Sequence, residues 1–178
     1  MSQPHHRRSI RLPGYDYADA GAYFITICTH GRACLFGQVV DGEMRLNALG
    51  EIVREEWEKS ATIRAEIEIG EYVIMPNHFH AIVMIGRGVR PDAPTENRPD
   101  TPTFPIGPKP KSIGALIAGF KSAATTRINQ TRQTPGAPVW QRNYWEHIIR
   151  DEQSWQNIAA YIQNNPQQWE QDQLFQIG

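Results

Sequence analysis

A proline-rich stretch near the middle of the chain limits what it can fold into. Residues 86–111 contain seven prolines in 26 positions and few apolar residues. Such a composition holds neither a helix nor an interior strand. The parts on either side each look too small to fold alone. We therefore expect one domain over residues 1–178, with 86–111 as an insertion or flexible loop.

The composition is that of a soluble globular protein. Hydrophobic residues make up 40% and charged residues 21% of the chain, which argues against wholesale disorder. No apolar run approaches the roughly 20 residues that span a bilayer, and no apolar segment follows the basic N-terminus as in a secretory signal. Two cysteines, Cys28 and Cys34, cannot form a disulfide scaffold. We expect a cytoplasmic protein with reduced thiols and no membrane partner.

The net charge of −1 hides an uneven distribution. Residues 86–150 carry ten Lys or Arg against four Asp or Glu, and residues 41–71 carry nine acids against four bases. The tail 1–20 begins with three arginines and no acid in its first eleven residues. Opposite patches of this kind permit a face that binds a polyanion, although they are also compatible with ordinary solvated surfaces.

Hydrophobic patterning predicts strands and helices on both sides of the proline-rich stretch. Strands are expected at 22–29, 43–46, 68–75, 78–85 and within 139–149, and helices at 48–60, about 112–129 and from about 151 to 165. Ser112 and Asp151 are the expected N-caps of the last two helices. This order predicts an α+β domain with helices packed on a mainly antiparallel sheet.

Two histidines begin the strand at 78–85. Side chains alternate along a strand, so His78 and His80 should share one face while Phe79 points to the other. Two imidazoles so placed can hold a divalent metal. A pair of histidines at a strand end without any ligand is the alternative.

The last helix offers two further candidates. Tyr161 and Asn165 are four residues apart and therefore share a helix face. The carboxamide oxygen of Asn165 suits a hard cation such as Mg²⁺ or Mn²⁺. Spacing alone favours a structural interpretation, with a tyrosine at the margin of the core and an asparagine that ends the helix before Pro166.

Four segments together resemble a known enzyme family. In chain order they are YFITICTHGR, EYVIMPNHFHAIVMI, NYWEHIIRDEQSW and YIQNNP. They resemble the single-tyrosine HUH transposases of the IS200/IS605 type. With RLPGYDY before the first strand, the pattern is most similar to the REP-associated tyrosine transposase branch. The resemblance runs from about Arg11 to Pro166.

The resemblance implies a fold, a reaction and roles for particular residues. The fold would be ferredoxin-like, with His78 and His80 as metal ligands and Tyr161 as the nucleophile. The enzyme would cut single-stranded or hairpin DNA through a covalent 5′-phosphotyrosine, with Mg²⁺ or Mn²⁺ as cofactor. In the insertion-sequence members the third metal ligand is usually a glutamine four residues after the tyrosine, and in this chain the shorter Asn165 would take that role. The resemblance leaves open a monomer or a homodimer, and a tyrosine that serves its own or a partner's histidines.

Basic residues are the candidates for DNA contacts. Lys121, Arg127 and Arg142 could bind phosphates, and the N-terminal arginines could follow a single strand or a hairpin stem; the latter are Arg7, Arg8 and Arg11. All could equally be solvated charges. Tyr144 is a rival nucleophile, and His147 is most simply a structural strand residue.

Three functions therefore compete. The first is a DNA-cleaving and strand-transferring transposase. The second is a hairpin-binding protein that has lost transposition. The third is a small metallohydrolase that forms no covalent adduct with DNA. An intact set of His78, His80 and Tyr161 favours the first, because a protein that only binds DNA has no need of all three.

Overall fold

The computed structural model describes residues 21–86 and 112–175. The expected basic tail, 1–20, and almost all of the proline-rich segment, 86–111, lie outside the described residues.

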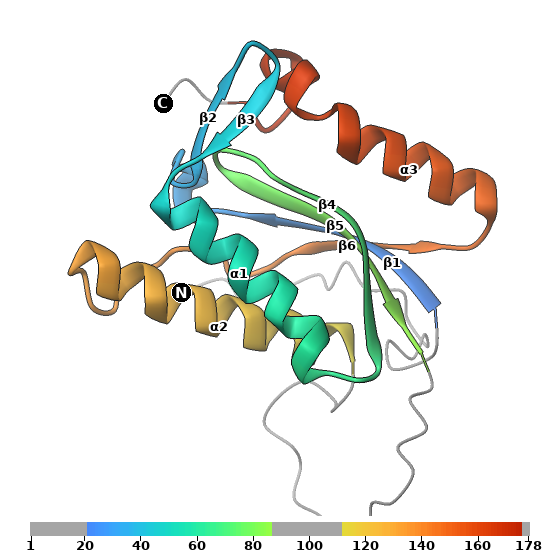
Figure 1. Ribbon diagram of the computed structural model, residues 1–178, viewed down its shortest axis with the longest axis horizontal. Helices are drawn as coiled ribbons and strands as arrows, with labels where there is room; N and C mark the ends of the chain where they lie inside the picture. Colours follow the sequence, from blue (N-terminus) through green and yellow to red (C-terminus); the bar gives the residue numbers. More distant parts are fainter. Residues whose placement is uncertain (1–20, 87–111, 176–178) are drawn as a thin grey trace, which may run out of the picture.

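A four-stranded antiparallel sheet forms the centre of the fold (Figure 1). Its strands lie in the order β4-β5-β1-β6, with bounds β1 Gly21–Cys28, β4 Ile67–Ile74, β5 His78–Ile85 and β6 Trp145–Ile149. The helices are α1 Ala48–Ile63, α2 Ile113–Arg132 and α3 Glu152–Asn164. The path β1-α1-β4-β5-α2-β6 through this strand order is ferredoxin-like, which confirms the fold class expected from the sequence.

The sheet separates two layers of helix. Helices α1 and α2 cover one face, and α3 crosses the other (Figure 1). Most of the core lies between the sheet and the first pair, where Phe79 packs edge-on against Trp57 of α1 and also contacts Phe120 of α2. A smaller apolar cluster, including Ile82 and Ile162, joins the opposite face to α3. The alternation of β5 therefore sends Phe79 into the core and its two histidine neighbours toward α3.

Side-chain caps fix where the helices begin. The side chain of Ser112 accepts a hydrogen bond from the Ala115 amide, and that of Asp151 accepts one from the Ser154 amide. Both N-caps expected from the sequence are confirmed, and each satisfies a backbone donor that the helix leaves free. Asn47 plays the same part for α1.

The structure also differs from the expected elements in three places. Strand β3, Glu43–Leu46, pairs with an unexpected strand β2, Gly37–Val40, in a separate hairpin. Asp41 and Gly42 both have positive φ angles there, as a two-residue hairpin turn requires. The strand expected within 139–149 is regular only from Trp145. After α3, the chain continues in an unexpected short 3₁₀ helix, η2 Pro166–Gln171.

Two glycines should respond oppositely to alanine substitution. Gly50 is buried in the first turn of α1, where a Cβ atom would overlap the carbonyl oxygen of Phe36. We expect Gly50→Ala to lower the free energy of unfolding by about 1–3 kcal/mol. Gly119 is exposed on α2, and its Cβ would meet only Arg64, at 3.4 Å. Gly119→Ala should stabilise by about 0.4–1 kcal/mol. Urea denaturation measures both, and a neutral Gly50→Ala would contradict the packing described.

Candidate active site

The two histidines of β5 lie side by side on the sheet face that α3 covers. Both are buried, His78 at 0% and His80 at 3% exposure, and their ring centroids are 4.5 Å apart. In the ladder to β1, Cys28 stands opposite His78 and Thr26 opposite His80. The shared face expected from alternation is observed, and the strand register determines which residues of β1 stand opposite the two histidines.

Hydrogen bonds fix which nitrogen of His78 is free. The Asn77 side-chain amide donates to the carbonyls of Leu174, at 2.8 Å, and Arg32, at 3.2 Å. Its oxygen must then accept from His78 Nδ1, 2.9 Å away. His78 Nε2 therefore carries the lone pair, and this buried atom has no hydrogen-bond partner among the described residues. Nδ1 of His80 is likewise bonded, to Thr26 Oγ1 at 2.8 Å.

Burial keeps both rings neutral at physiological pH. It lowers the pKa of His78 to about 4. Burial, together with the neighbouring His78, lowers the pKa of His80 well below its usual value. Neutral imidazole is the form that binds a metal or accepts a proton.

Tyr161 reaches this pair from α3 of the same chain. Its hydroxyl oxygen is 3.3 Å from His80 Nε2, and its ring packs edge-on against Phe24. The side chain is 41% exposed, so a substrate can approach it. Burial and the charge of Asp172 raise the pKa of Tyr161. The tyrosine and the histidines therefore meet within one chain.

Asp172 is the site residue that sequence reasoning missed. It follows η2, and its Oδ2 atom lies 3.0 Å from Asn165 Nδ2 and 3.5 Å from the Tyr161 hydroxyl. Its carboxylate and one nitrogen of each histidine lie within 4.8 Å of one another. No sequence periodicity relates Asp172 to β5 or to α3. It lies next to the histidines because the chain turns back toward them after η2.

The unpaired atoms of the site fit a cation. Asn165 is buried, and its Oδ1 atom, like His78 Nε2, has no hydrogen-bond partner in the described parts of the chain. A buried acceptor without a donor is costly, and a cation would satisfy both. Two imidazole nitrogens, an amide oxygen and a carboxylate form a mixed donor set that could hold a divalent metal ion.

A cleft of about 790 Å³ opens beside Tyr161. Its floor is the sheet face that bears Phe24, Thr26 and His80. One side is the segment 141–145, and the other includes residues of α3, of η2 and of the chain after it. No lysine or arginine of the described ranges lines the cleft.

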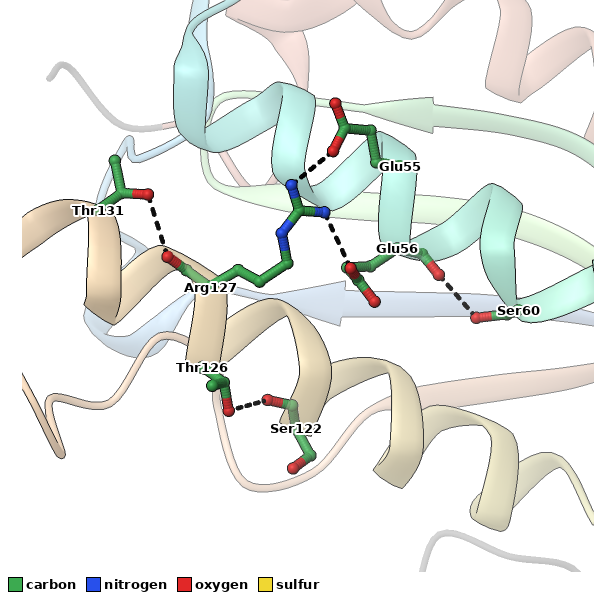
Figure 2. A network of polar contacts seen from close by, with 7 residues as sticks. All are labelled: Glu55, Glu56, Ser60, Ser122, Thr126, Arg127 and Thr131. Atoms are coloured by element: carbon green, nitrogen blue, oxygen red, sulfur yellow. Dashed lines mark hydrogen bonds and ion pairs between the residues drawn. The ribbon is translucent and has the colours of Figure 1, made fainter. Parts of the chain in front are cut away.

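The basic residues expected at DNA are placed in different surroundings. Arg127 lies between α2 and α1, where it forms ion pairs with Glu55 at 2.6 Å and Glu56 at 2.9 Å (Figure 2). DNA would have to displace two carboxylates to reach it. Lys121 donates to the backbone carbonyls of residues 141 and 143, at 2.9 and 3.1 Å, and burial lowers its pKa to about 8.

The other residues that the sequence suggested for the site lie near the cleft, on β6 or outside the described residues. Arg142 is exposed between two residues that line the cleft. Tyr144 lines the cleft beneath the Lys121 ammonium, 5.8 Å from its ring centroid. His147 stacks on Trp145 along β6 and does not join the histidine pair. Arg7, Arg8 and Arg11 fall outside the described residues.

Two further expectations concern the cysteines and the membrane. Cys28 and Cys34 are both free thiols. Among the helices of the described ranges, none has the length and apolar character to cross a bilayer.

Known proteins resemble this chain in sequence and in fold. No protein-family model matches it. An uncharacterized protein of Haemophilus influenzae is 43% identical over 171 residues, which cover 96% of this chain and 94% of the relative. The solved structure of a REP-associated tyrosine transposase bound to a REP hairpin aligns with a TM-score of 0.58 and 19% identity, over 90% of this chain and 74% of that one. The transposase-like fold implied by the sequence motifs is thereby confirmed.

Proposed function

Since this chain belongs to the same family as the Haemophilus influenzae protein and has the fold of a REP-associated tyrosine transposase, we propose that it is a metal-dependent transposase. It would cut and rejoin single-stranded DNA at hairpin-forming sequences through Tyr161. The observation that carries this proposal is the meeting of an accessible tyrosine hydroxyl, two neutral histidines and a carboxylate at one cleft.

The reaction is a transesterification at phosphorus. The Tyr161 oxygen forms a bond to the scissile phosphorus, and the bond from phosphorus to the 3′ oxygen breaks. The phenol proton passes to Asp172, whose carboxylate is in reach at 3.5 Å, and water protonates the leaving 3′ oxygen. The product is a 5′-phosphotyrosine and a free 3′-hydroxyl. Attack by another 3′-hydroxyl reverses the step and joins strands without an added energy source.

Activation of the phenol needs its neighbours. An ordinary tyrosine has a pKa near 10, and here the pKa is raised further by burial and by Asp172. Asp172 is therefore placed as the proton acceptor, since the same charge that raises the pKa can receive the proton. His78 and His80, with the Asn165 amide oxygen, would hold a divalent cation beside the Asp172 carboxylate. When bound, the cation would neutralise charge on the phosphate.

Cleavage is tested directly with a labelled hairpin oligonucleotide that has single-stranded flanks. In Mg²⁺ or Mn²⁺ the protein should become covalently attached to the label, and the adduct should survive denaturation and disappear under digestion of the protein. Hairpin binding without an adduct would instead identify a DNA-binding protein that has lost transposition. Cleavage with turnover but without an adduct would identify a metallohydrolase.

Removing the amide of Asn165 should weaken metal binding, so that cleavage needs a higher metal concentration. If Oδ1 is a ligand, Asn165→Ala should raise the Mn²⁺ concentration for half-maximal cleavage by about 10- to 100-fold, the range seen for altered metal surroundings. Saturating Mn²⁺ should restore part of the rate. Asn157, exposed on the same helix, provides the control, because Asn157→Ala should leave the metal titration unchanged. An unaltered titration for Asn165→Ala would mean that it only ends the helix.

We also propose that phosphate contacts come from exposed basic residues beside the cleft. Arg142 is the described candidate, and Arg7, Arg8 and Arg11 are the candidates from the tail. Arg142→Gln should weaken single-strand binding and flatten the plot of log affinity against log salt by about 0.7 for one lost phosphate contact. Arg127→Gln should leave that slope unchanged, since its guanidinium is held by Glu55 and Glu56. Titrations at several salt concentrations measure both slopes.

A further inference from the structure

Away from the proposed metal site, the side chains that line the cleft beside Tyr161 suit a nucleobase better than a phosphate. Phosphate sites use lysine, arginine or backbone amides, and no basic side chain from the described residues lines this cleft. The cleft has four Phe, Tyr or Trp residues and six glutamine or asparagine residues in its walls. Carboxamides carry both donors and acceptors and match the edges of bases, and aromatic rings stack on base faces.

Trp145 is the aromatic surface that is free to take a ligand. It is 46% exposed, and the other large hydrophobic side chains that are well exposed among the described residues are Ile63, at 63%, and Tyr161, at 41%. Two of those three therefore border one cleft. Phe24 meets Trp145 edge-on at 5.6 Å, and His147 lies parallel to it at 5.8 Å. The indole is thus fixed in orientation while nearly half of it faces solvent.

The strand register places Trp145 close to the reacting groups. Trp145 of β6 is opposite Thr26 of β1, and Thr26 is opposite His80 of β5. These three residues form one row across the sheet, and Thr26 bonds His80 directly. The ring of Tyr161 lies over the same region, in contact with both Phe24 and His80. A group stacked on Trp145 would therefore be a close neighbour of the nucleophile.

The side-chain amides of the cleft are available to a ligand. Those of Gln141 and Asn143 on one side, and of Gln168 and Gln171 on the other, form no hydrogen bond within the parts of the chain that the structure describes. Lys121 holds the backbone of the first side through two carbonyls. The backbone of that side is therefore held in place by the Lys121 ammonium.

We propose that this cleft binds an unpaired nucleobase of the single strand, next to the bond that Tyr161 attacks. Trp145 would stack on the face of the base, and the side-chain amides on the two sides of the cleft would form hydrogen bonds with its edge. The inference rests on the proposed function and adds a source of sequence preference to it. The volume, about 790 Å³, is within the range that encloses a small-molecule ligand, so a nucleotide fits.

Binding of matched oligonucleotides separates base contacts from phosphate contacts. The probes are oligo-dT, oligo-dA and oligo-dC, with an abasic oligomer of equal length that keeps the phosphates and lacks the bases. A chelator prevents cleavage during the measurement. Wild-type protein should bind its best base oligomer at least about 10-fold more tightly than the abasic oligomer, equivalent to about 1.4 kcal/mol and within the range measured for stacking.

Variants of Trp145 then test the assignment. Trp145→Ala should remove most of the preference for bases, change abasic binding less than about 2-fold, and leave the circular dichroism spectrum unchanged, since the side chain is half exposed. Trp145→Phe should keep the preference. A wild-type protein that forms the tyrosine adduct but binds both kinds of oligomer equally, or a Trp145→Ala protein with unchanged preference, would overturn the inference and leave the proposed function standing. A protein that binds no oligomer and forms no adduct would overturn both.

Discussion

Tyr161→Phe should abolish the covalent protein–DNA adduct while hairpin binding remains within about 2-fold of wild type. The substitution removes only the hydroxyl, and loss of a nucleophile in other enzymes lowers turnover by on the order of 10⁶-fold. The ring should stay in place, because its contacts with Phe24 and His80 do not involve the oxygen. Gel analysis of labelled DNA after denaturation measures the adduct, and anisotropy of the same DNA measures binding.

Tyr144→Phe is the matched control for this prediction. Tyr144 lines the same cleft, but it lies on the segment before β6 and is not part of the group formed by the histidines and Asp172. Its variant should form the adduct at close to the wild-type rate. If Tyr161→Phe still forms an adduct and Tyr144→Phe does not, the nucleophile has been assigned to the wrong tyrosine.

The parts of the fold that follow from local pattern were predictable from the sequence. The bounds of β5 were predicted as observed, because Pro76-Asn77 ends the preceding strand and an unbroken apolar run follows. The opposite directions of Phe79 and its histidine neighbours follow from strand alternation alone. The N-caps Ser112 and Asp151 could also be predicted, because serine and aspartate are both preferred at the N-cap position of a helix.

The missed features depend on contacts between distant parts of the chain. Asp172 belongs to the site only because η2 returns the chain to the end of the central strands, a path that no periodicity encodes. Strand β2 is short and half-exposed, so its composition barely differs from a loop. Arg127 and Lys121 look like free cations in the sequence, and only the packing of α2 shows the groups that hold them. The sequence could therefore supply the histidines and the tyrosine, but not the surroundings that determine their chemistry.

Phe79→Ala and His80→Ala should separate stability from activity on adjacent residues of one strand. Phe79 is fully buried and contacts the rings of Trp57 and Phe120. Its truncation should lower the free energy of unfolding by about 3–5 kcal/mol, since the lost contacts leave a cavity among rigid rings. His80→Ala should cost less, about 1–3 kcal/mol, because it removes two polar contacts, to Thr26 and to the Tyr161 hydroxyl, each with the usual value of about 0.5–1.5 kcal/mol.

Activity should follow the opposite order. His80→Ala removes a neutral imidazole that lies 3.3 Å from the Tyr161 hydroxyl, so adduct formation should fall below detection in Mg²⁺ and Mn²⁺ alike. Phe79→Ala, where still folded, should retain the metal dependence of the wild type, because its side chain points away from the site. Urea denaturation and the adduct assay on the same preparations measure both quantities. A His80→Ala protein as unstable as Phe79→Ala would mean that the histidine is needed for folding, and the metal site would have to be placed elsewhere.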